Sequence, residues 1–180
     1  MQSLSHTWGT TATERQLVFP CDRILSNPDD SLFRGVTIQA APATVFRWLC
    51  QMRVAPYSYD WIDNGGRKSP RELSPDLEQL EVGQNVMRIF DLVEFERDRH
   101  LTLRVKPGTR AAQSFGDIVV SYLIVVGEPE PGFCRLLVKL IAQYPPGAKG
   151  WLMSMLLPCG DLVMMRRQLL NFKQLAENSQ

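Results

Sequence analysis

The chain has 180 residues, 44% of them hydrophobic and 22% charged, which is enough for one globular domain with a sizeable core. Its 20 Lys and Arg residues nearly balance its 19 Asp and Glu residues, leaving a net charge of +1. A chain this close to neutral gives no electrostatic reason to bind a nucleic acid or an anionic membrane, so neither is expected as a partner.

The sequence also favours a cytoplasmic protein. The N-terminal segment is polar and lacks the apolar stretch of a secretory signal. The longest apolar run, residues 119–127, is too short to span a bilayer, so no integral membrane segment is expected. The cysteines are far apart, form no CxxC pair and are interpreted as reduced thiols (Cys21, Cys50, Cys134 and Cys159). Neither His6 nor His100 is near a cysteine and no nucleotide-binding motif is present, so neither a metal nor a cofactor is expected.

The first half of the chain predicts a tail, a strand and a helix in that order. Residues 1–15 are rich in Ser and Thr and are expected to form a loose tail before a single domain over residues 16–180. Residues 33–40 alternate in polarity like a strand. Residues 41–52 carry apolar side chains at helical spacing, and Pro42 suits the first turn of a helix. A long connection with two Ser-Pro steps follows.

The second half begins with predicted strands. Residues 85–98 contain either one bent strand or two short ones, and residues 100–108 alternate cleanly. Residues 117–132 and 133–147 predict the two strands of a long hairpin. One face of the strand at 100–108 is expected to lie in solvent and carries polar residues (His100, Thr102 and Arg104).

The chain ends in helix. Residues 149–157 are helical in pattern, but Pro158 and Gly160 are expected to stop or kink the helix. Asp161 is then expected to begin a last amphipathic helix. Its apolar stripe recurs at spacings of three and four (Leu162, Met165, Leu169, Phe172 and Ala176). The predicted fold class is therefore α+β, with an antiparallel sheet curled around a long C-terminal helix and room for an apolar pocket between them.

Three stretches resemble a known superfamily. RGVTIQAAPATVFRWLCQM (residues 34–52) resembles the opening of the START/Bet v1-like, or SRPBCC, superfamily, whose fold is the helix grip. YSYDWIDNGGRKSPREL (residues 57–73) and GDLVMMRRQLLNFKQLAE (residues 160–177) are similar to its bacterial polyketide cyclase/dehydrase-like branch. Arg53 departs from the pattern, because many members of the branch have glycine there. The resemblance implies a hydrophobic cavity between sheet and helix, but no single activity, since the superfamily includes lipid carriers, hormone receptors and aromatase/cyclases.

The candidate ligand-binding residues centre on the aromatic stretch YSYDW. Tyr57, Tyr59 and Trp61 alternate, so an extended backbone would place all three rings on one side. They would then either line a ligand pocket or cap the open end of the core. Asp60 and Asp63 flank Trp61, and turn formation is their simplest role. The other predicted wall residues come from the helices and one strand (Trp48, Arg88, Met165 and Leu169).

Three functions remain open on the sequence. The leading hypothesis is binding of a hydrophobic or aromatic small molecule, lipid- or polyketide-like, between the sheet and the C-terminal helix. The first alternative is a polyketide cyclase or dehydratase that uses Tyr59 or Asp60 for acid/base chemistry. The second is a protein-interaction module. The apolar residues of 145–158 could form a gate over the cavity or the contact of a homodimer.

Overall fold

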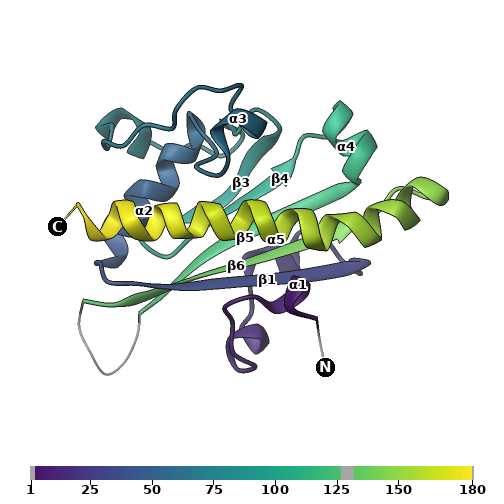
Figure 1. The fold of residues 1–180 in the computed structure, drawn as a ribbon, viewed down its shortest axis with the longest axis horizontal. Coiled ribbons are helices and arrows are strands. Elements are labelled where there is room, and N and C mark those ends of the chain that lie inside the picture. Colours follow the sequence, from purple (N-terminus) through teal and green to yellow (C-terminus); the bar gives the residue numbers. More distant parts are fainter. Residues whose placement is uncertain (1–2, 127–131, 180) are drawn as a thin grey trace.

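The computed structural model describes residues 3–126 and 132–179 (Figure 1). Six antiparallel strands form one sheet in the order β1-β6-β5-β4-β3-β2, and a long C-terminal helix, α5 (Ala148–Glu177), crosses one face of it. The strands are β1 (Asp30–Ile38), β2 (Asn85–Val86), β3 (Phe90–Glu96), β4 (His100–Val105), β5 (Asp117–Val126) and β6 (Cys134–Gln143). The predicted α+β arrangement of sheet and C-terminal helix is confirmed.

Four shorter helices surround this unit. They are α1 (Leu4–Thr7), α2 (Pro42–Cys50), α3 (Asp60–Asp63) and α4 (Arg110–Phe115). Figure 1 shows α2 beside the C-terminal half of α5 and α4 near the other end of that helix. Four 3₁₀ turns complete the described elements (Glu14–Gln16, Pro20–Arg23, Gln51–Arg53 and Pro75–Glu78). In the part of the chain that the structure describes, no helix combines the length and the apolar character needed to cross a membrane.

Strand pairing follows the predicted pattern. β5 and β6 pair over their whole length, from Asp117↔Gln143 to Val126↔Cys134, which confirms the long hairpin. Residues 85–98 form two strands, β2 and β3, separated by a turn in which Met87 and Arg88 have positive φ. β1 pairs with the other side of β6, so the first strand of the chain is an edge strand of the sheet and lies beside the last strand.

The break predicted near Pro158 does not occur, because α5 is one continuous helix of 30 residues with Pro158 inside it. Proline removes one backbone hydrogen bond and crowds the preceding turn, but packing along a helix can outweigh that local cost. Here the Pro158 carbonyl accepts a hydrogen bond from Arg34 of β1 (3.2 Å), and Pro158 itself is buried. Asp161 is consequently a residue of the helix interior rather than its start.

On the strand face predicted to lie in solvent, His100 and Thr102 are buried instead, and only Arg104 at its end stays partly exposed. Residues 17–25 cross the outer face of the sheet and bury a second, smaller apolar cluster that includes Phe19 and Cys21. Thr102 shares a hydrogen bond with Ser121 (2.9 Å), whose hydroxyl also accepts from the backbone of Cys21 (2.9 Å). The sequence pattern of β4 shows two faces but does not show that another segment covers the polar one.

The N-terminal residues expected to form a loose tail also pack against the sheet in their described part. Gly35 N donates to the Trp8 carbonyl (3.1 Å), and Arg135 pairs with Glu14 (2.7 Å). Gly9 has φ +75°, and a Cβ at this position would lie 2.1 Å from the Gly35 carbonyl oxygen. This close approach of two backbones requires glycine. Residues 3–16 therefore pack tightly against β1 and β6.

Candidate functional site

A cavity of about 710 Å³ lies between the sheet and the N-terminal half of α5. Its walls come from β5, β6, the turn between β2 and β3, α4 and α5. Most of the lining is apolar and includes Phe90, Ile118, Val120, Leu140, Leu157 and Met164. Its volume falls within the range of sites for small molecules, roughly 300–1,000 Å³.

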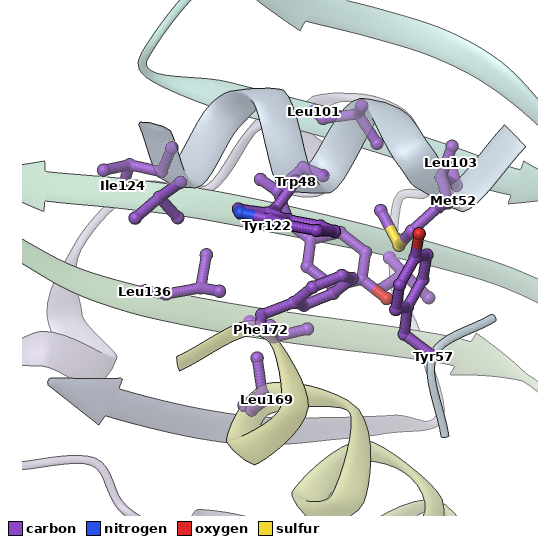
Figure 2. Packing of buried hydrophobic residues seen from close by; sticks show 14 of the residues in the cluster. Trp48, Met52, Tyr57, Leu101, Leu103, Tyr122, Ile124, Leu136, Leu169 and Phe172 are labelled. Atoms are coloured by element: carbon purple, nitrogen blue, oxygen red, sulfur yellow. The ribbon is translucent and has the colours of Figure 1, made fainter. Parts of the chain in front are cut away.

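The interior beneath the C-terminal half of α5 is packed instead. Leu169, Phe172 and Ala176 of this helix are fully buried against α2 and the sheet. Figure 2 shows Trp48, Tyr57 and Phe172 meeting there, with ring centroids 6.1 Å apart for Trp48 and Tyr57 and 5.3 Å apart for Tyr57 and Phe172. The large rings therefore fill one half of the space under α5, and the other half stays open.

The predicted wall residues are divided between these regions. Arg88 and Met165 line the cavity. Three other candidates, Trp48, Tyr57 and Leu169, are buried in the packed core (Figure 2). Each of these three is at most 1% exposed, and none borders the cavity.

The alternation assumed for YSYDW is also absent. Tyr57 has φ +58°, and Asp60 begins the short helix α3, so the backbone does not stay extended. Trp61 is 76% exposed, and the Tyr59 ring lies on the surface, 6.0 Å from the Arg167 guanidinium. Both rings border a separate, polar surface pocket of about 250 Å³. The three aromatic side chains thus do not share one side.

Smaller residues in and beside this aromatic stretch contribute to the cavity instead. Pro56, Ser58 and Asp63 line it, and Ser58 Oγ donates a short hydrogen bond to Asp63 Oδ2. Asp63 Oδ1 is buried and has no hydrogen-bond partner in the part of the chain that the structure describes, and burial raises the pKa of this carboxyl. Asp60, by contrast, accepts from the backbone N (3.0 Å) and the hydroxyl of Ser69, which is the turn-forming role expected for it.

The cavity wall also contains a carboxylate that the sequence did not single out, Asp161 of α5. Its side chain is 7% exposed, and Oδ2 lies 2.7 Å from Nη2 of Arg34, which is 1% exposed. Burial raises the pKa of Asp161 to about 6, although Arg34 opposes the shift. A signal was present in the sequence, because Arg34 falls on the inward face of β1 with Leu32 and Val36. Charged residues at apolar-face positions are rarely buried unless they are paired.

A line of polar contacts separates the cavity from the packed core. The Tyr122 hydroxyl donates to Gln168 Oε1 (2.8 Å), and Gln168 Nε2 donates to the Pro56 carbonyl. Asn171 Nδ2 donates to the Tyr57 carbonyl (2.7 Å). These bonds fix the segment after α2 onto α5, and Tyr122 and Gln168 present their polar ends at the cavity. Within residues 3–126 and 132–179, no cluster of three His, Cys, Asp or Glu side chains could hold a metal ion.

Comparison with known proteins places this geometry in a fold. No family model and no curated protein matches the chain. Among solved structures, the hypothetical protein jhp0584 of Helicobacter pylori has a TM-score of 0.57 at 14% identity, with 89% of this chain and 95% of that chain covered. Protein MLL2253 of Mesorhizobium loti has a TM-score of 0.50 at 14% identity, covering 84% and 99%. The di-domain ARO/CYC StfQ of the steffimycin biosynthetic pathway has a TM-score of 0.50 at 10% identity, covering 83% of this chain and 51% of StfQ.

The fold is the helix grip, an antiparallel sheet curled around a long C-terminal helix. This confirms the predicted fold, and identities of this size establish the fold alone. In this helix-grip chain the cavity lies where the resemblance predicted it, between the sheet and the C-terminal helix.

Proposed function

We propose that this helix-grip protein binds a hydrophobic or aromatic small molecule in the cavity between the sheet and α5. The observation that carries the proposal is an apolar space of about 710 Å³ left open in an interior that is otherwise packed. Protein interiors contain few voids larger than a water molecule, so an open space of this size is typical of a ligand-binding site. A small-molecule ligand accounts for it better than a partner protein, which would need an exposed surface.

The walls continue to the surface, which gives a ligand a way in. Ile89, Phe115 and Leu156 line the cavity and are each partly exposed. A ligand that loses about 250 Å² of apolar surface to these walls gains roughly 6 kcal/mol at about 25 cal/mol per Å². A gain of about 6 kcal/mol corresponds to a Kd of about 40 μM, and part of it offsets the lost freedom of the ligand, so a Kd between about 40 μM and 1 mM is the expected scale for a purely apolar probe.

Gly160 offers a way to fill the cavity without damaging the core. It lines the cavity on the inner stripe of α5, and a Cβ added there meets no other atom within 4 Å. We expect Gly160→Phe to weaken binding of the neutral fluorophore N-phenyl-1-naphthylamine by at least about tenfold, because the ring occupies the ligand's space. Val163→Phe is the matched control, because Val163 is exposed on α5 and does not line the cavity.

Fluorescence titration measures both variants, and native mass spectrometry of protein purified from its host identifies any bound molecule. The proposal fails if the wild-type protein does not bind the probe, or if Gly160→Phe binds it as well as Val163→Phe does.

A second candidate function is a cyclase or dehydratase reaction in the same cavity. The observation that favours it is the pair of carboxyls in the wall, Asp63 and Asp161, whose pKa values are both raised by burial. A carboxyl with a raised pKa can serve as general acid or base near neutral pH. Tyr59 and Asp60, the residues proposed for this chemistry from the sequence, do not line the cavity. Conversion of a linear poly-β-ketone to an aromatic product, lost in Asp63→Asn or Asp161→Asn but kept in Tyr59→Phe, would support it.

A further inference from the structure

The Asp161 carboxylate is an unfilled acceptor in the wall of the cavity. Arg34 Nη2 lies 2.7 Å from Oδ2, yet the contact does not have the geometry of a hydrogen bond. Among residues 3–126 and 132–179, Oδ2 is buried and accepts no hydrogen bond of good geometry. Buried carboxylates normally accept several hydrogen bonds, so a donor is missing here.

The reason lies in how Arg34 uses its protons. Its Nη2 carries two N–H groups, and these donate to the carbonyls of Ser5 (2.8 Å) and Pro158 (3.2 Å). Its Nη1 donates to the Phe33 carbonyl (2.9 Å). Arg34 therefore neutralises the charge of Asp161 while three of its Nη protons go to the backbone of α1, β1 and α5. Its Nε–H is buried without a partner among the described residues.

The phenols near this carboxylate do not supply the donor either. Burial, above all, raises the pKa values of Tyr122 and Tyr144, and the charge of Asp161 adds to both shifts. The Tyr122 hydroxyl donates to Gln168 Oε1 (2.8 Å), and the Tyr144 hydroxyl donates to Asp30 Oδ2 (3.1 Å). Asp161 therefore lines the cavity with a carboxylate whose Oδ2 has no hydrogen-bond donor of good geometry among the described residues.

We propose that Asp161 is the polar anchor of the cavity and accepts a hydrogen bond from an uncharged hydroxyl group of the ligand. This proposal rests on the proposed binding function and specifies the ligand's chemical class, an apolar body with a hydroxyl group at its buried end. A ligand carboxylate would be repelled by Asp161. An ammonium group would meet the charge of Arg34, which lies 2.7 Å from the same carboxylate. A ketone or an ether has no proton to donate.

A set of naphthalene probes that differ in one substituent tests the anchor. Each displaces N-phenyl-1-naphthylamine from the wild-type protein in neutral buffer: 2-naphthol, 2-methoxynaphthalene, 2-naphthoate and 2-naphthylmethylammonium. We expect 2-naphthol to bind roughly tenfold more tightly than 2-methoxynaphthalene, the scale of one hydrogen bond to a charged group. The anion and the cation are expected to bind more weakly than 2-naphthol.

Two variants locate the effect. Asp161→Asn keeps the size of the side chain but removes its charge, and it is expected to reduce the preference for 2-naphthol to about twofold or threefold. Asp63→Asn tests the competing carboxyl of the cavity wall, whose Oδ1 also has no partner among the described residues. Asp76→Asn is the matched control, because Asp76 is exposed and does not line the cavity, and it should leave the preference unchanged. If Asp161→Asn does not fold, the double variant Arg34→Met/Asp161→Leu replaces both charges by apolar side chains, and it should bind the two neutral probes equally.

The outcomes separate this proposal from the binding function. If neither neutral probe binds, the binding function fails, and the anchor fails with it. If both bind with equal affinity to the wild-type protein, the binding function stands and the anchor is refuted. Tightest binding by the ammonium probe, or loss of the preference in Asp63→Asn, would also overturn the proposal, because the anchor would then be a cation site or a different carboxyl.

Discussion

Replacing Arg34 by Met should be one of the most damaging single changes in this protein. Arg34 is 1% exposed on the inner face of β1, and its guanidinium joins α1, β1 and the middle of α5. Methionine retains an unbranched apolar stem of similar shape, so the substitution mainly removes hydrogen bonds and charge. The expected loss of stability can therefore be assigned to these two effects.

The magnitude follows from the contacts. Three hydrogen bonds to backbone carbonyls are lost, at about 1 kcal/mol each, or about 3 kcal/mol together. The charge effect is limited by the pKa of Asp161, which is about 6 in the folded protein. Without Arg34 this carboxyl becomes protonated, so at about pH 7 the added loss is at most about 1.4 kcal/mol. The free energy of unfolding should therefore fall by about 4 kcal/mol at that pH.

The two contributions separate with pH. At about pH 5 most of Asp161 is already protonated in the folded wild-type protein, so only the loss of about 3 kcal/mol from hydrogen bonds remains. Urea unfolding of the wild-type protein and Arg34→Met at the two pH values measures both. Arg104→Met is the control, because the Arg104–Asp117 pair is 37% and 28% exposed and should contribute no more than about 1 kcal/mol. A loss below about 1 kcal/mol for Arg34→Met, or the same loss at both pH values, would refute this reasoning.

Three further predictions concern other positions. The pKa of Asp161 is raised from 3.8 to about 6, so the stability that its protonated form contributes is complete below about pH 4 and is lost as the pH rises through 6. Relative to Asp161→Asn, the free energy of unfolding of the wild-type protein should fall by about 3 kcal/mol over this range. The same pH dependence of unfolding by urea in both proteins would contradict this. Gly9→Ala should lower the free energy of unfolding by at least about 2 kcal/mol, because its Cβ would overlap the Gly35 carbonyl. Gly65→Ala is the control, because Gly65 also has positive φ but lies in open space, and it should cost only about 1 kcal/mol. Equal effects would show that residues 3–16 do not pack tightly against β1. Trp61→Ala should change the free energy of unfolding by no more than about 0.5 kcal/mol and should leave the affinity for N-phenyl-1-naphthylamine unchanged, because the ring is exposed. Weaker binding of this probe would show that Trp61 contacts the ligand.

The candidate site was only partly predictable from the sequence. Arg88 and Met165 were predicted as wall residues and border the cavity, whereas Tyr57 is in the core and Trp61 is on the surface. The prediction for YSYDW assumed an extended backbone, but the positive φ of Tyr57 and the helical turn at Asp60 rotate the side chains away from one another. A single residue in the left-handed region is enough to cancel an alternating pattern.

Local patterning by itself determined the order of the main elements. Alternating polarity specified the hairpin of β5 and β6, and helical spacing specified α2 and the C-terminal part of α5, because these periods follow from the geometry of one segment. Contacts between distant segments decided the rest. α5 continues through Pro158, whose carbonyl accepts from Arg34, and residues 17–25 cover the outer face of the sheet. The large side chains fill only the space under the C-terminal half of α5. Burial, pairing and empty space depend on several segments together. For this reason only the tertiary structure determined the bounds of the cavity and the presence of the Asp161 carboxylate in its wall.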